Sequence, residues 1–461
     1  MIYDYAFVKK PKLNVKRILA GLLAGALALS VTGCASSGES SSDASNTVSA
    51  GSSTSGTDEK TTIVFAEHVA DVQNQAPQVW GVIQSYMKDH PNVVIDVQGT
   101  AADEHETKMK LAAQSDSLPD LFYVKVGNGL EMVKAGQLAD LTDDILGDEE
   151  FAAGFLDNML DVLKVDGKIY GLPCELQCNG VWYNKRLFDQ FGLEIPETYE
   201  DLMHCCQVFN ENGIIPMARG TTDAWSCWAL LNDFCRFGYY DHIDNILAGT
   251  ENWNNPDYLK FYQKLEEMTE ANMWPENVSS IGYWEATELF LGEKAAMFDS
   301  GVWDTKKFEQ SDFAEDIYFG WGPTYTDGVG NQEISMKPAS HPYVVSGKLQ
   351  KEDPEKYAAV IDFLKYYYGT EGTRIIVEEN QSVPVTKYTG TVDSVEYPVF
   401  SRVMEKVGDD LPSPATAPNM YLPGEFEATF FESISGVLNG IYSPEEALTF
   451  LDDQMKAMGL V

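Results

Sequence analysis

Residues 166–188 read DGKIYGLPCELQCNGVWYNKRLF, and this stretch decides the fold of the 461-residue chain. It predicts a strand edge at 168–172, a polar crossing at 173–180, and a second strand that leads into a helix. Pro173 has no backbone N–H and disfavours helix just before it. Polar and apolar residues alternate along the crossing, so three polar side chains share one face: Glu175, Gln177 and Asn179. Between two lobes this face would line a cleft, whereas on a half-buried strand it would only be solvated.

The length and charge of the chain limit what it can be. A chain of 461 residues is too long for one hydrophobic core, which predicts two or more lobes. With 32 basic and 71 acidic residues, the formal net charge is −39. Such a chain repels nucleic acid and anionic lipid, so we expect no nucleic-acid partner. A neutral or cationic small ligand fits this charge better than an anionic one, although acidity also serves solubility alone.

The first 33 residues form a predicted secretory signal. Basic residues between 9 and 17 precede an apolar run at 18–29, which is too short for a comfortable membrane span. The run leads to Val31-Thr32-Gly33-Cys34, which resembles a bacterial lipobox. The resemblance implies that Cys34 becomes the diacylated N-terminus, and two acyl chains anchor a protein stably to a membrane. The alternative is an ordinary signal in which the cysteine is coincidental.

Six further cysteines raise the question of a metal site. They are Cys174, Cys178, Cys205, Cys206, Cys227 and Cys235. Their spacing matches neither a zinc pattern nor an evident disulfide framework. We therefore predict no metal and no cofactor, and we interpret these residues as small buried hydrophobes, with disulfide formation left open.

Beyond a Ser-rich stretch at 34–60, which predicts a disordered tether, strands and helices alternate from Thr61 onward. Strands are expected at 61–66, 93–98 and 121–126, with helices between them. This alternation predicts an α/β fold with right-handed crossovers. Ligands of such sheets sit beyond the carboxyl ends of the strands. At these ends the sequence has Glu67, His68, Gly127 and Asn128.

Aromatic rings beside acids and amides suggest a sugar site. An aromatic ring stacks on the C–H face of a sugar, while carboxylates and amides hydrogen-bond its hydroxyl rim. The candidate binding residues are Glu67, His68, Asn128, Glu175, Gln177, Asp223, Trp225, Trp284, Asp299, Trp303, Asp304 and Tyr421. Any single tryptophan among them can equally be a core ring. No catalytic residue is predicted, since the chain has no nucleophile elbow, zinc-protease helix, phosphate loop or dinucleotide-binding glycines.

Four motifs follow one another along the chain. They are SLPDLFYV…AGQLADLT at 117–142, GKIYGLPCE…GVWYNKRLF at 167–188, IPETYEDL at 195–202 and FLGEKAAMFDSGVW at 290–303. Together they resemble the extracellular solute-binding proteins of sugar ABC importers, the maltose-binding type. The resemblance implies a type II periplasmic-binding-protein-like α/β fold of two lobes, each a mainly parallel sheet flanked by helices. It places the stacking tryptophan of that family at Trp303.

This chain departs from the family pattern at two places: the loop 327–340 lacks a Gly-rich run, and Cys174 and Cys178 are unusual in the crossover.

The resemblance also implies a domain plan and a role. The plan begins with a signal peptide at 1–33 and a tether at 34–60. The N-terminal lobe comprises 61–174 and 342–381, and the C-terminal lobe comprises 180–338 and 387–461. Hinge crossovers join the lobes near 174–180, 338–343 and 381–386. We expect a monomer, lipid-anchored outside the bacterial cell membrane, that captures a carbohydrate between its lobes and delivers it to an ABC permease. The alternatives are a binding protein for a non-sugar solute, such as a polyamine or peptide, and a surface glycosidase.

Overall fold

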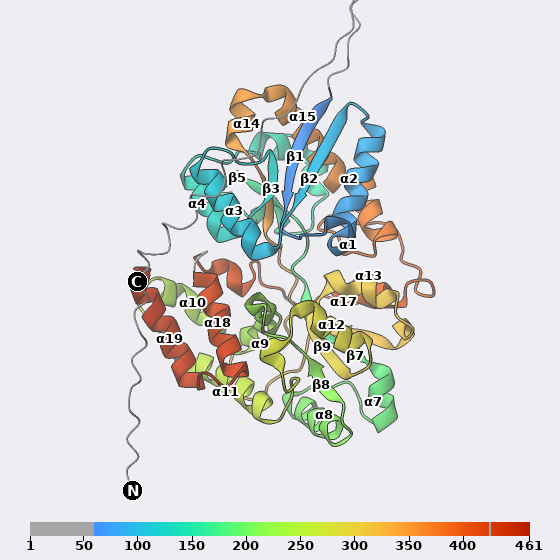
Figure 1. The fold of residues 1–461 in the computed structure, drawn as a ribbon, viewed down its shortest axis with the longest axis vertical. Coiled ribbons are helices and arrows are strands. Elements are labelled where there is room, and N and C mark those ends of the chain that lie inside the picture. Colours follow the sequence, from blue (N-terminus) through green and yellow to red (C-terminus); the bar gives the residue numbers. More distant parts are fainter. Residues whose placement is uncertain (1–59, 424–425) are drawn as a thin grey trace, which may run out of the picture. The chain divides into compact units, whose positions relative to one another are not determined.

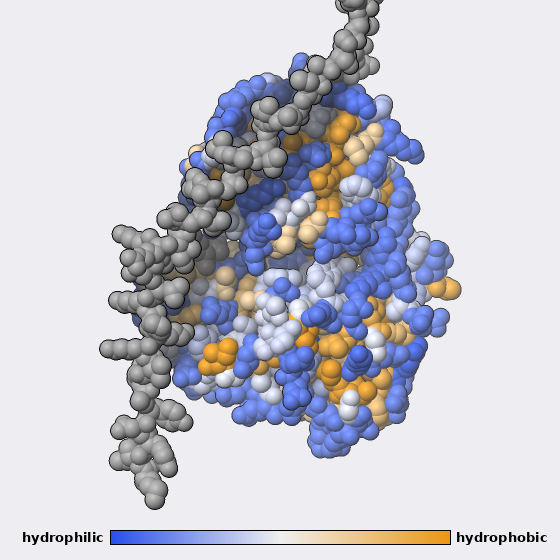
Figure 2. Space-filling model, in the orientation of Figure 1, coloured by the Kyte–Doolittle hydropathy of each residue, from blue (hydrophilic) through white to orange (hydrophobic). Residues whose placement is uncertain are grey.

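The computed structural model describes residues 60–423 and 426–461, without the side chain of Tyr421 (Figure 1). The predicted signal peptide, Cys34 and all of the tether except Lys60 lie outside the described residues. Within these ranges the chain forms two lobes, each built on its own sheet. Among the described residues no helix is long and apolar enough to cross a bilayer. Hydrophilic side chains cover much of the face seen in Figure 2, with smaller hydrophobic areas between them.

Five strands form the sheet of the N-terminal lobe, in the order β2-β1-β3-β11-β6. They are β1 (Thr61–Glu67), β2 (Val93–Gly99), β3 (Leu121–Tyr123), β6 (Gly171–Pro173) and β11 (Pro342–Val345). β1 runs parallel to β2 and β3, whereas β11 lies antiparallel between β3 and β6. Ile63, Phe65 and Phe122 are fully buried in this sheet, as its predicted apolar strands require.

Helices flank this sheet, with α2 packed on β2 and α15 on β1 (Figure 1). They are α1 (Val72–Gln75), α2 (Pro77–Asp89), α3 (Ala102–Gln114), α4 (Val126–Lys134), α5 (Thr142–Leu146), α6 (Glu149–Ala153), η2 (Met159–Asp161), α14 (Gly347–Glu352), α15 (Pro354–Tyr368), α16 (Thr370–Arg374) and the π-helix η7 (Ile375–Glu379). A short ribbon joins β4 (Lys164–Val165) to β5 (Lys168–Ile169). β3 ends earlier than expected because α4 begins at Val126, so Asn128 lies in the first turn of a helix.

Four strands form the sheet of the C-terminal lobe, in the order β10-β7-β9-β8. They are β7 (Asn179–Asn184), β8 (Ile215–Ala218), β9 (Ala295–Gly301) and β10 (Ile317–Gly320). Only β8 and β9 are parallel; β7 runs antiparallel to both β9 and β10. The two-lobed α/β fold is confirmed, but the prediction of mainly parallel sheets is wrong for this lobe. The chain enters β7 from the crossover, at the edge where β9 ends, so the two strands must run in opposite directions.

The helices of the C-terminal lobe come from the middle and the end of the chain. They are α7 (Lys185–Phe191), α8 (Tyr199–Glu211), η3 (Ala224–Leu230), α9 (Leu231–Arg236), α10 (Tyr239–Leu247), α11 (Pro256–Glu270), η4 (Val278–Ser280), α12 (Tyr283–Leu291), η5 (Val302–Asp304), α13 (Thr305–Glu309), η6 (Ala314–Asp316), α17 (Pro398–Val407), η8 (Pro418–Tyr421), α18 (Phe426–Leu438) and α19 (Pro444–Ala457). Capping boxes begin two of these helices, with Thr198 and Asp201 before α8 and Ser443 and Glu446 before α19. The six cysteines at 174–235 are buried, as predicted, and none of them forms a disulfide, a question that the sequence left open.

Two of the predicted crossovers lie side by side between the sheets. The backbone N–H of Cys174 donates to the carbonyl of His341 (3.1 Å), and that of Gln177 donates to the carbonyl of Pro338 (2.8 Å). Between these bonds the N–H of Ser340 donates to the carbonyl of Glu175 (2.9 Å). The first and second crossovers therefore form one short antiparallel ribbon, from which the side chain of Glu175 projects.

Candidate functional site

The carboxyl end of β1 carries a buried acid and a histidine that bind each other. Glu67 is fully buried, and its carboxylate accepts hydrogen bonds from the Tyr343 hydroxyl (2.5 Å) and from Nδ1 of His68 (2.7 Å). The His68 ring stacks on Tyr123, with centroids 3.8 Å apart. Burial raises the pKa of Glu67, but the opposite charge of His68 and these hydrogen bonds outweigh it, so its pKa lies below the usual value.

The same pairing favours the charged form of His68. Burial lowers its pKa, but the charges of Glu67, Glu175 and Glu106 raise it above the usual value. The pair therefore favours an imidazolium that is bonded to a carboxylate.

The start of α4 carries a second group of polar side chains. Asn128 is buried, and its amide donates to the carboxylate of Glu106 from α3. Glu106 also accepts from the backbone N–H of Lys125 (3.0 Å). Burial raises the pKa of Glu106, even though the hydrogen bond from Asn128 and the charge of Lys125 oppose this shift. Asn128 is therefore engaged by a neighbour in its own lobe.

A buried ion pair joins the two lobes. Nζ of Lys125, after β3, lies 2.7 Å from Oε2 of Glu427 on α18, and the two side chains are 21% and 5% exposed. Asn419 of η8 donates to the other oxygen of Glu427 (2.8 Å), and Gln177 of the crossover donates to Asn419 (3.3 Å). We call Lys125, Glu427, Asn419 and Gln177 the interlobe network. Burial raises the pKa of Glu427, but the charge of Lys125 outweighs it and the pKa falls below the usual value.

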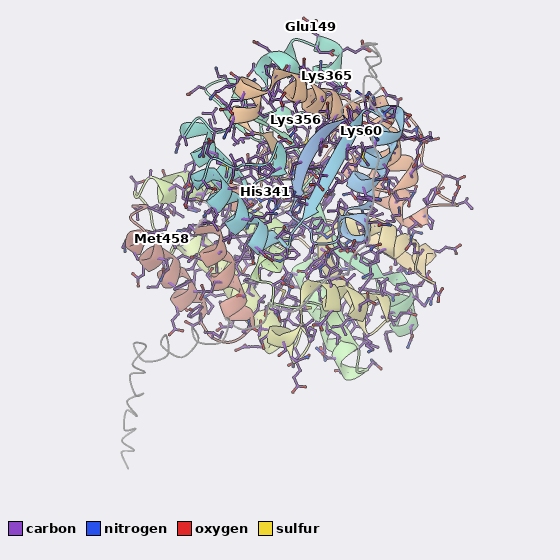
Figure 3. The ribbon with its side chains drawn as sticks, turned by 45° about the horizontal axis from the view of Figure 1, so that its top comes forward. Lys60, Glu149, His341, Lys356, Lys365 and Met458 are labelled. Atoms are coloured by element: carbon purple, nitrogen blue, oxygen red, sulfur yellow. The ribbon has the colours of Figure 1, made fainter. Side chains whose placement is uncertain are left out.

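His341, labelled in Figure 3, lies beside this network. Its Nδ1 accepts from the backbone N–H of Val126 (3.2 Å), and its Nε2 is 3.9 Å from Glu427. Burial lowers the pKa of His341 to about 4, so the ring is neutral near pH 7. It therefore adds no positive charge to the network.

Glu175 lines a small cavity at the crossovers. The cavity walls also include Trp303, Tyr367, Tyr368, Gln78, Cys174 and residues 382–386 of the third crossover. Its volume of about 20 Å³ holds roughly one water molecule. No donor among the described residues reaches the Glu175 carboxylate, in contrast to that of Glu67. Burial raises the pKa of Glu175 to about 7, although the charge of His68 opposes this shift.

Trp303, which also lines this cavity, is held in place by buried polar side chains. Its indole Nε1 donates to the hydroxyl of Tyr283 (2.7 Å), and that hydroxyl in turn donates to Asp304. Asp304 also accepts from Ser300 (2.7 Å), and burial raises its pKa to about 6. A Cβ atom at Gly301 would overlap the Trp303 ring, so only glycine leaves room for it. Asp304 thus positions Trp303 and is itself 2% exposed.

The other candidates lie apart from this cavity. Asp223 accepts from the backbone N–H of Tyr283 (2.9 Å) at the start of α12, and Trp225 packs on the Tyr283 ring at 4.9 Å. Trp284 is 42% exposed. Asp299 is buried in an ion pair with Arg219 inside the C-terminal lobe. Tyr421 lies in η8, and its side chain is not among those that the structure describes.

The structure therefore brings together only some of the predicted sugar-binding residues. Glu175 and Trp303 share one cavity, and the charge of Glu175 acts on the nearby His68. Gln177 and Lys125 join the interlobe network. Sequence reasoning missed Glu106, Lys125, Tyr283, His341, Asn419 and Glu427. Lys125 could have been noticed beside Asn128, but Glu427 carries no local signal, because its partner lies 302 residues away.

Comparison with known proteins agrees with this architecture. The sequence model of the family described as "Bacterial extracellular solute-binding protein" matches residues 67–374. The multiple sugar-binding protein of Streptococcus mutans is 22% identical over 339 residues, which cover 68% of this chain and 77% of that protein. An uncharacterised ABC transporter extracellular-binding protein of Pyrococcus horikoshii is 28% identical over 230 residues, 49% of this chain. That match spans only about half of the Pyrococcus protein, 53% of its length.

Solved structures show the same fold. One comes from work on xylan utilisation by Caldanaerobius polysaccharolyticus; it has a TM-score of 0.75 and 24% identity, covering 86% of this chain and 100% of that one. Another is the solute-binding protein RafE in complex with raffinose, with a TM-score of 0.69 and 17% identity over 86% of this chain and 99% of that one.

Proposed function

Because this chain belongs to the family of bacterial extracellular solute-binding proteins, we propose that it captures a sugar or oligosaccharide between its lobes and hands it to an ABC importer. The observation that carries this proposal is the cavity shared by Trp303 and Glu175. An indole ring and a carboxylate are the two groups that a sugar ring needs, one for its C–H face and one for its hydroxyls. The names of similar proteins, which include a multiple sugar-binding protein, support the same class of ligand.

The proposed contacts come from both lobes and from the crossover. The C-terminal lobe contributes Trp303, with Trp225 close to it through Tyr283. The crossover contributes Glu175 and Gln177. The N-terminal lobe contributes His68, which is partly exposed, with Glu67 holding its ring. Asp299, Asp304 and Trp284 are left out, because the first two are buried in other pairings and the third is 42% exposed.

Binding is proposed to work by closing the lobes around the sugar. The described cavity is too small for a sugar ring, so the lobes must part to admit one. The interlobe network gives the closed form its own stabilisation, and a sugar adds contacts that exist only in that form. Binding then shifts the balance between open and closed forms by that difference in affinity.

The remaining parts of the proposal concern the setting. We propose that Cys34 carries the lipid anchor outside the cell membrane, that the protein acts as a monomer, and that it binds without catalysis. A cationic solute such as a polyamine is the second candidate, because the Glu175 carboxylate has no donor among the described residues. A glycosidase needs an acid and a second carboxylate on opposite sides of a bond, and Glu67 is already held by His68 and Tyr343.

A thermal-shift screen against a carbohydrate panel tests the proposal. A sugar at a hundred times its dissociation constant adds about 2.7 kcal/mol to the free energy of unfolding, which raises the melting temperature measurably. Replacing Trp303 by alanine should abolish that rise, whereas replacing the exposed Trp284 by alanine should leave it intact. If no carbohydrate raises the melting temperature while spermidine does, the sugar proposal is wrong.

A further inference from the structure

The acceptors at the crossover outnumber the donors that could satisfy them. The Glu175 carboxylate receives no hydrogen bond within the described ranges. Gln177, two residues further along the chain, is 8% exposed, and its amide N–H donates a hydrogen bond to Asn419. Its Oε1 is buried and accepts no hydrogen bond from the described residues. The hydroxyl of Tyr367, which is 2% exposed and lines the same cavity as Glu175, has no partner by geometry among the described residues, and it can donate as well as accept. A ligand that brings several N–H donors would fit this region.

The nearby positive charges are already taken. His68 is bound to Glu67, and Lys125 is bound to Glu427. His341 is neutral near pH 7, because burial lowers its pKa to about 4. Five carboxylates act on His68 and Lys125, those of Glu67, Asp103, Glu106, Glu175 and Glu427. Three of the five therefore lack a matching cation, and Glu175 is the one that faces the cavity.

The groups around Glu175 suit a cation better than a second hydroxyl. An ammonium has three N–H donors and no acceptor, so it satisfies oxygen acceptors without adding another. The Trp303 ring lines the same cavity, and an indole ring attracts a cation as well as the C–H face of a sugar. A neutral hydroxyl offers one donor and leaves the negative charge of Glu175 unmatched.

We infer that the sugar bound here carries a protonated amine, which lies against the carboxylate of Glu175 beside the Trp303 ring. The inference rests on the proposed function and narrows its substrate class to amino sugars. Burial raises the pKa of Glu175 to about 7, which fits a carboxylate that gains a cationic partner only when ligand is bound.

Matched sugars that differ in one group provide the test. Oligosaccharides of chitosan, of chitin and of cellulose have the same β-1,4-linked backbone and carry an amine, an acetamide or a hydroxyl at C2. Glucosamine with glucose, and galactosamine with galactose, extend the comparison to single rings. Isothermal titration calorimetry on the purified full chain at pH 7 should give at least tenfold tighter binding for an amine than for its hydroxyl counterpart.

Two variants locate the effect. Glu175→Gln should reduce the amine preference to less than about threefold, whereas Glu131→Gln, at an exposed position on α4, removes the same charge and should leave the preference unchanged. Raising the salt concentration from about 0.05 M to about 0.5 M should weaken amine binding and leave neutral binding unaffected. The salt series needs no variant, so it holds even if Glu175→Gln folds poorly.

The outcomes separate this inference from the proposed function. Equal or weaker binding of every amine, or a preference that survives Glu175→Gln, overturns the inference. If neutral sugars bind tightly in that case, the proposed function stands by itself. If spermidine binds and no sugar of either kind does, both fail.

Discussion

Replacing Lys125 by methionine should open the lobes in the absence of any sugar. Methionine has nearly the same length as lysine but no charge, so the variant leaves Glu427 facing an apolar group. Glu427 is 5% exposed in the described form, and its carboxylate is 2.7 Å from the lysine Nζ. A buried carboxylate without its partner regains water most easily if the lobes move apart.

The size of the effect follows from this geometry. At an effective dielectric constant of about 20, two charges 2.7 Å apart attract by roughly 6 kcal/mol, and desolvation cancels much of this gain. Breaking a buried pair by removing one partner typically costs about 3–5 kcal/mol. Taking about 3 kcal/mol, the ratio of closed to open molecules should fall by roughly 150-fold.

Spin labels on the two lobes can measure that ratio. Leu111 on α3 and Ile441 before α19 are 60% and 66% exposed, and the described native cysteines are buried, so cysteines placed at these two positions take the labels. The distance distribution of Lys125→Met should shift to longer values, and Glu427→Gln should do the same to a lesser degree. Lys164→Met is the matched control, because its pair with Asp161 is exposed and contributes at most about 1 kcal/mol.

The reasoning is refuted if Lys125→Met and Lys164→Met give the same distance distribution as the unaltered chain. A fall in melting temperature without a change in distance would show that the pair stabilises the fold and does not control closure. Combining Lys125→Met with Glu427→Gln should cost less than the sum of the single changes, since both remove the same interaction.

Three further predictions concern the site. Gly301→Ala should lower stability by about 1–3 kcal/mol in urea unfolding and weaken sugar binding, because the added Cβ overlaps the Trp303 ring; unchanged binding would contradict this packing. Tyr283→Phe removes the hydroxyl that holds the Trp303 indole and Asp304, so sugar affinity should fall about tenfold and the tryptophan fluorescence should change. Stability should fall by about 1–3 kcal/mol, because the buried Asp304 carboxylate and the indole N–H lose this partner. The pKa of Glu175 is raised from 4.5 to about 7, so the folded form binds more protons than the unfolded form between these pH values. The free energy of unfolding should therefore fall as the pH rises from 4.5 to 7, by up to about 3 kcal/mol. In urea titrations Glu175→Gln should flatten this slope, and Glu131→Gln should not.

Local patterns in the sequence predicted the elements of the fold well. The alternation of strands and helices that gives β1 and β2 acts within a few residues, so the chain carries that information locally. The crossover at Pro173 was predicted for the same reason. The direction of β7 was not, because it depends on where the chain enters the second sheet.

The site was harder to predict because its key relations are distant or hidden. In β9 the side chain of Asp299 points toward Arg219, whereas that of the next residue, Ser300, bonds Asp304, and the sequence does not say which face meets the cleft. The acid at Asp304 resembled a ligand contact, but the hydroxyl of Tyr283 binds it in the interior. Glu427 meets Lys125 from the far end of the chain, and no local pattern reveals such a partner.

The paired crossovers limit how the molecule can move. Three backbone hydrogen bonds tie 174–177 to 338–341, so neither strand can slide or twist without its neighbour. The two paired strands therefore allow the lobes to rotate about one axis and resist rotation about any other. Deleting one residue from either strand would shift the register of these hydrogen bonds. The lobes would then be wrongly oriented, even if each lobe folded normally.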